Sequence, residues 1–92
     1  GKKMTPLESA EAARRALQIL ESLSEFTVEE VEPKLRQLVE DLGYSAGQVF
    51  GILRAAVTGQ TVSPPLFESM EIVGREKVLE RLKRAIKVLE SM

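Results

Sequence analysis

The stretch from Thr5 to Leu23, TPLESAEAARRALQILESL, decides the fold class of this 92-residue chain. Its first residues are typical of a helix start: Thr5 caps, Pro6 takes the first helical position, and Glu8 has the spacing of a capping box. Apolar residues then recur at intervals of three and four, which places them on one helical face. We therefore expect an amphipathic helix that ends at about Leu23.

Two further helix starts follow along the chain. One lies at Thr27, where the capping-box spacing is repeated, and the other at Ser45. Gly43 has the place of a left-handed stop after the second helix, and Gly59 ends the third. Pro33 removes a backbone donor inside the second apolar stripe, so we expect a kink, or a short helix that restarts there.

The C-terminal third contains a short apolar segment, residues 66–73, and a final helix from Arg75 to about Leu89. Since no segment alternates with period two over a useful length, the sequence predicts an all-α fold, a compact bundle of about five helices. At this length we expect a single domain over residues 1–92, in which residues 1–4 have the character of an artificial start.

The composition excludes several classes of chemistry. Because the chain has no Cys and no His, it lacks disulfides, thiolates, the usual zinc ligand sets and His-assisted nucleophiles. Carboxylates are plentiful but fall on polar helix faces, so we expect no catalytic residue and no metal site. Without an apolar run of ~18 residues or a signal peptide, we expect a soluble cytoplasmic or organellar protein with no membrane partner.

Charge is distributed unevenly although the net charge is −1. Residues 1–46 hold 6 Lys/Arg against 9 Asp/Glu, and residues 47–92 hold 7 against 5. Cations at about one-turn intervals on the final helix would suit a phosphate backbone, and the interleaved glutamates would equally suit ordinary surface pairing. The candidate phosphate contacts are Lys77, Arg81, Arg84 and Lys87.

Two glycines, Gly47 and Gly51, lie inside the third helix. Each costs about 1 kcal/mol relative to alanine. We therefore expect the backbone of a neighbouring helix to approach closely at this face, with contact to a ligand as the alternative.

The segment LRAAVTGQTVSPPLFE, Leu53 to Glu68, combines one cation with a stiffened loop. We expect Arg54 to be partly shielded at the helix end nearest the loop. The two prolines reduce backbone freedom and leave hydroxyls such as that of Ser63 displayed in a fixed shape. Such a surface suits the unstacked bases of single-stranded RNA, and it suits a protein partner equally well.

Five sequence blocks resemble the C-terminal anticodon-binding region of bacterial-type glutamyl-tRNA synthetase, a class I aminoacyl-tRNA synthetase. They are FTVEEV (26–31), LVEDLG (38–43), LRAAVTG (53–59), SPPLFE (63–68) and GREKVLERL (74–82), in the order and spacing of that family. The resemblance implies the distal, all-helical part of that region, which grips the anticodon loop of tRNA(Glu). Carried over by motif, the anticodon-binding residues are Arg54, Ser63, Pro64 and Leu66. Pro65 departs from the small residue common in the family.

The HIGH-like and KMSKS-like signatures of the family's active site are absent from this chain. The resemblance therefore implies a fragment that is not catalytic alone and needs no cofactor, taken from a ligase that uses ATP and Mg2+ to attach glutamate to tRNA. Its expected partners are the tRNA(Glu) anticodon loop and the rest of the synthetase chain, and we expect the fragment to be monomeric. The alternative is a helical protein-interaction module, in which the proline loop and an apolar groove receive a partner helix.

Overall fold

The computed structural model describes residues 5–59 and 65–92. They form five helices, α1 (Pro6–Ser22), α2 (Val28–Leu42), α3 (Ala46–Thr58), α4 (Leu66–Val73) and α5 (Arg75–Glu90), and no strand within those two ranges. The predicted all-α class is confirmed. The prediction of a single domain over residues 1–92 stays a prediction.

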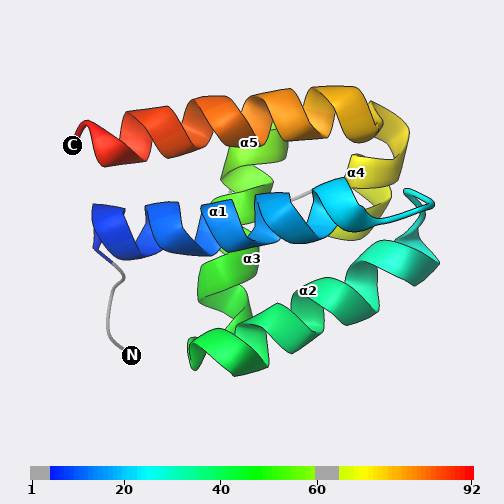
Figure 1. Cartoon of the computed structure of the whole chain (residues 1–92), viewed down its shortest axis with the longest axis horizontal. Helices are drawn as coiled ribbons and strands as arrows, with labels where there is room; N and C mark the ends of the chain where they lie inside the picture. Colours follow the sequence, from blue (N-terminus) through cyan, green and yellow to red (C-terminus); the bar gives the residue numbers. More distant parts are fainter. Residues whose placement is uncertain (1–4, 60–64) are drawn as a thin grey trace.

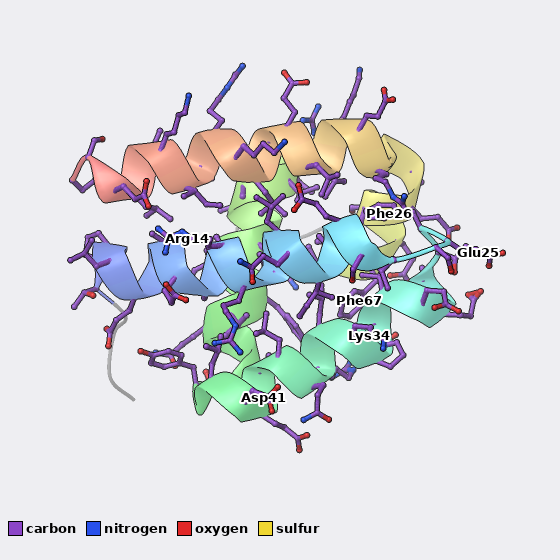
Figure 2. The ribbon with its side chains drawn as sticks, viewed as in Figure 1. Arg14, Glu25, Phe26, Lys34, Asp41 and Phe67 are labelled. Atoms are coloured by element: carbon purple, nitrogen blue, oxygen red, sulfur yellow. The ribbon has the colours of Figure 1, made fainter. Side chains whose placement is uncertain are left out.

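Helix α3 crosses a pair of antiparallel helices. α1 and α5 lie side by side and run in opposite directions, and α3 passes behind both at a steep angle (Figure 1). α2 lies below α1 in Figure 1, the short α4 lies at the right in contact with α2, α3 and α5, and α3 contacts all four other helices. Arg14 of α1, which lies on the side of α1 that faces α5 (Figure 2), forms an ion pair with Glu90 of α5. This pair is partly exposed, so its contribution to stability is small.

The core takes side chains from every helix. The periodic apolar positions of the sequence supply it, because each helix turns its three-four stripe inward. Its largest fully buried side chains are Leu20, Leu35, Leu38, Leu53, Met70, Leu82, Val31, Val49, Val57 and Val78.

The first and third helix starts are complete capping boxes. The Thr5 hydroxyl accepts a hydrogen bond from the amide of Glu8 at 3.1 Å, and the Glu8 carboxylate accepts one from the amide of Thr5 at 2.8 Å. Ser45 and Gln48 repeat the arrangement at the start of α3. Four backbone donors that have no partner within their helices are thereby satisfied locally.

The second helix start uses a different partner. The Thr27 hydroxyl accepts from the amide of Glu30 at 3.4 Å, which is one half of the expected box. The next free donor, the amide of Val28, is instead satisfied by the carboxylate of Glu71 in α4, at 2.9 Å. A residue distant in sequence therefore supports this cap and ties α4 to α2.

The expected restart of the helix at Pro33 is wrong. α2 is one helix from Val28 to Leu42 with Pro33 inside it. The proline cannot donate to the carbonyl oxygen of Glu29 one turn earlier. Both residues are exposed, so water can satisfy that carbonyl while the buried stripe on the opposite face holds the helix together.

The expected close approach at Gly47 and Gly51 is also wrong. A Cβ atom added at either position would meet no heavy atom of another described segment within 4 Å. α3 packs on the core through a different stripe, which includes Val49, Leu53 and Val57. Among the described residues, space for a methyl group is therefore open at both glycines.

Candidate nucleic-acid interface

Arg54 lies in the last turns of α3, one turn before the helix ends at Gly59, whose φ of 77° is left-handed. Its side chain is half-buried and its Nε atom is fully buried. The hydroxyl of Thr58 donates to the carbonyl oxygen of Arg54 at 2.7 Å and fixes this turn. The structure thus places Arg54 partly shielded at the predicted helix end, and its contact with RNA stays a prediction.

Leu66 is the first residue of α4 and only 3% exposed. Its side chain belongs to the hydrophobic core together with Leu53 and Val57 of α3. The helix start has no side-chain cap, so first-turn amides of α4 lack a helical partner. The backbone amide of Leu66 is therefore better placed to contact a ligand than its buried side chain. Packing in the core also connects Leu66 to α3, the helix that carries Arg54.

Two of the predicted anticodon-binding residues, Ser63 and Pro64, lie outside the described residues. Of the four, the structure therefore places Arg54 and Leu66. These two sit on α3 and α4, which are in contact. The sequence between them holds the last turn of α3 and then the proline loop, and α4 begins directly after the loop with Leu66.

The four candidate phosphate contacts on α5 are all exposed, but two of them have protein partners. Arg81 Nη1 donates to the carbonyl oxygen of Val57 at 2.6 Å, and Arg84 lies 4.0 Å from the carboxylate of Glu80. Together with Lys77 these three side chains line a shallow hollow of about 210 Å³. The structure thus gathers three of the four candidate phosphate contacts and gives Arg81 a structural role as well.

Arg81 and Arg84 also border a larger open groove of about 650 Å³ between α3 and α5, with a contribution from α1. Its floor is made mainly of small and apolar side chains, among them Ile52, Ala56 and Val88. The sequence did not reveal this groove, because it forms only where α3 crosses α5.

A second arginine, Arg36 of α2, escaped the sequence analysis. Its guanidinium carbon lies 5.7 Å from the ring centroid of Phe50 and 5.8 Å from that of Phe67. The three residues come from three different helices, and their sequence spacing contains no signal that would bring them together.

Arg75 opens the block GREKVLERL and has a structural role. Its Nη2 atom donates to the carbonyl oxygen of Leu23, and its guanidinium carbon lies 5.9 Å from the ring centroid of Phe26. Arg75 therefore joins the start of α5 to the end of α1 and the connection that follows it.

The described ranges 5–59 and 65–92 lack the features of a metal site and of a membrane span. There, no group of three or more Asp or Glu side chains is arranged to hold a metal ion. No helix in the same ranges has both the length and the apolarity of a membrane span.

Comparison with known proteins identifies the family. The family described as "Anticodon binding domain" matches residues 1–86. A glutamate–tRNA ligase of Dehalococcoides mccartyi is 44% identical over 91 residues, which are 99% of this chain and 19% of that protein. A glutamate–tRNA ligase of Roseiflexus castenholzii is 44% identical over 88 residues, 96% of this chain and 17% of that protein.

A more distant relative, glutamate–tRNA ligase 2 of Thermosipho melanesiensis, is 37% identical over 83 residues, 90% of this chain and 18% of that protein. This chain thus spans less than a fifth of the length of these curated relatives. The resemblance carried by the sequence blocks is confirmed, and the chain belongs to the family of anticodon-binding domains found in glutamate–tRNA ligases.

Proposed function

We propose that this chain recognises the anticodon loop of tRNA(Glu) as part of a glutamate–tRNA ligase. The observation that carries the proposal is the match of nearly the whole chain to an anticodon-binding domain. The placement of Arg54 near the end of α3, where its side chain is half-buried, supports it.

Arg54 would act as a positioned planar cation. A guanidinium presents a fixed fork of donors and a flat face, so it can bond to a base edge or stack on a base. Partial burial of Arg54 limits its rotamers, and a side chain ordered before binding loses less entropy when RNA arrives. Ser63 and Pro64 would supply a hydroxyl and backbone groups from the loop, and Leu66 an amide at the start of α4.

The basic residues of α5 would add contacts to the phosphate backbone. Lys77 and Arg84 are exposed on the same side of α5 as the shallow hollow, and Lys87 follows one turn later than Arg84. These charges would raise affinity without reading sequence.

The chain would contribute substrate selection and leave the chemistry to the rest of the ligase. We propose a monomeric part of a cytoplasmic enzyme whose other domains bind ATP, Mg2+ and glutamate. The described residues offer no cluster suited to a metal, and we assign no step of the ligase reaction to them.

The test is the substitution Arg54→Ala in a full-length glutamate–tRNA ligase that contains this domain. We expect the KM for tRNA(Glu) to rise about tenfold or more, as for the loss of one good base contact, while the KM for glutamate stays unchanged. Arg15→Ala, which removes an exposed cation from α1, is the matched control and should leave both constants unchanged. Equal kinetics for Arg54→Ala and the parent would contradict the proposal.

A helical protein-interaction module is the second candidate, and the groove between α3 and α5 favours it. Its volume of about 650 Å³ and its apolar floor suit the face of a partner helix. A single protein partner that remains bound to the chain after nuclease treatment, and is lost with Ala56→Glu in the groove floor, would support this candidate.

A further inference from the structure

We propose that Arg36 is a second stacking position for an unpaired base of the same RNA strand, beside the position at Arg54. This inference deepens the proposed function and rests on it. It assigns a nucleobase, rather than a phosphate, to a surface formed by α2, α3 and α4.

One side of the Arg36 guanidinium is held by aromatic rings. The rings of Phe50 and Phe67 meet edge to face, with centroids 5.3 Å apart and planes at 80°. The guanidinium carbon lies within 6 Å of both ring centroids, a distance at which a cation is attracted to a ring face. Phe67 points from α4 toward the interior of the molecule (Figure 2), so the rings form a fixed support.

The orientation of the guanidinium is fixed a second time by Glu32, one turn earlier on α2. Oε2 of Glu32 accepts a hydrogen bond from Arg36 Nε at 2.8 Å, and the same oxygen lies 2.8 Å from Arg36 Nη2 as an ion pair. This pairing offsets the positive charge and leaves the planar group in place. The site therefore favours an uncharged flat ligand over a phosphate, for which an unpaired cation would be the better partner.

The other side of Arg36 faces solvent. Its side chain is 57% exposed although it makes all these contacts. Next to it lies a hollow of about 350 Å³ between α2 and α3, lined in part by Gln37, Glu40 and Phe50. An unstacked base can lie on a guanidinium plane, and the hollow provides room beside that plane.

Two glycines leave space on the side of α3 that carries Phe50 and Arg54. Phe50 and Arg54 are four residues apart on α3, so they are separated by about 6 Å along the helix axis. Gly47 and Gly51 share this side of α3, and no heavy atom of another described segment lies within 4 Å of a Cβ built at either. A single strand could therefore pass along α3 from Arg54 to Arg36 without meeting a side chain at these two positions.

The experiment measures binding of the 92-residue chain to a fluorescent RNA stem-loop that carries the tRNA(Glu) anticodon, over a series of salt concentrations. Arg36→Ala and Arg36→Lys should each raise the Kd about tenfold, since stacking needs the plane and not the charge. The slope of log Kd against log salt should not change. Lys34→Ala, which removes an exposed cation two residues away, is the matched control and should bind like the parent.

Thermal melting of each variant separates lost binding from lost folding, and Arg36→Lys keeps the charge over the two rings. Three outcomes would overturn the inference. If Arg36→Lys binds like the parent and Arg36→Ala has a smaller salt slope, then Arg36 is a phosphate contact. If Arg36→Ala binds like the parent while Arg54→Ala binds weakly, then Arg36 only covers the aromatic pair, and the proposed function stands. If the parent chain does not bind the stem-loop, the proposed function fails and the inference fails with it.

Discussion

Arg81 of α5 donates a hydrogen bond of 2.6 Å to the carbonyl oxygen of Val57 in the last turn of α3. No backbone amide within α3 donates to that carbonyl oxygen, because the last four carbonyls of an α-helix lack helical partners. The positive charge also lies at the negative end of the α3 dipole. Arg81 thereby fixes the helix end that carries Arg54.

Arg81→Ala should therefore lower the free energy of unfolding. We expect a loss of about 1 kcal/mol, below the usual value for a charged donor because the side chain is largely exposed. For a domain of this size, that loss lowers the Tm by about 4–8 °C. Thermal denaturation followed by circular dichroism measures it. Lys83→Ala on the same helix is the control, and equal Tm values for the two variants would show that the Arg81 contact contributes nothing.

Gly51→Ala should stabilise the chain by about 0.5–1 kcal/mol, because alanine is the better helix former and nothing obstructs its methyl group. Gly43→Ala is the matched comparison and should lower the stability of the chain. Gly43 ends α2 with a φ of 78°, which costs a non-glycine residue about 1–2 kcal/mol. Urea denaturation of both variants gives the two values. A destabilised Gly51→Ala variant would mean that a segment of the chain does pack on this face.

Tyr44 is the only tyrosine, and the chain has no tryptophan, so phenolate absorbance reports on this one side chain. Its hydroxyl donates to the Glu8 carboxylate at 2.8 Å. This hydrogen bond, burial and the negative charge of Glu8 raise the pKa of Tyr44 above its ordinary value of 10.0. An absorbance titration should therefore have its midpoint above 10.0, and Glu8→Gln should bring the midpoint back toward that value.

The same pKa shift determines how the stability of the folded chain changes with pH. The pKa of Tyr44 is higher in the folded state, so the contribution of the Glu8 hydrogen bond to stability is present below pH 10 and is lost as pH rises through the raised pKa. Identical titration midpoints for the parent and Glu8→Gln would contradict this assignment.

Local signals in the sequence predicted most of the fold. The capping box at Thr5, the helix start at Ser45 and the stops at Gly43 and Gly59 depend on neighbours in the chain, so a sequence is sufficient to find them. The restart expected at Pro33 did not occur because the exposed side of α2 tolerates a missing hydrogen bond, and exposure is a tertiary property.

In the candidate site, too, local sequence predicted some residues and only the tertiary structure revealed others. Arg54 could be placed from its position before Gly59 and the proline loop. The contacts of Arg36 could not, because its two aromatic partners reach it from other helices. The hydrogen bond from Arg81 to Val57 likewise exists only because α3 crosses α5.

The central claim is that this chain reads an anticodon. The most direct measurement compares its Kd for the tRNA(Glu) anticodon stem-loop with its Kd for a stem-loop of the same stem and loop length whose three anticodon bases are replaced. We expect the tRNA(Glu) stem-loop to bind at least about tenfold more tightly, and Arg54→Ala to reduce that preference. Equal affinity for the two RNAs would contradict the account.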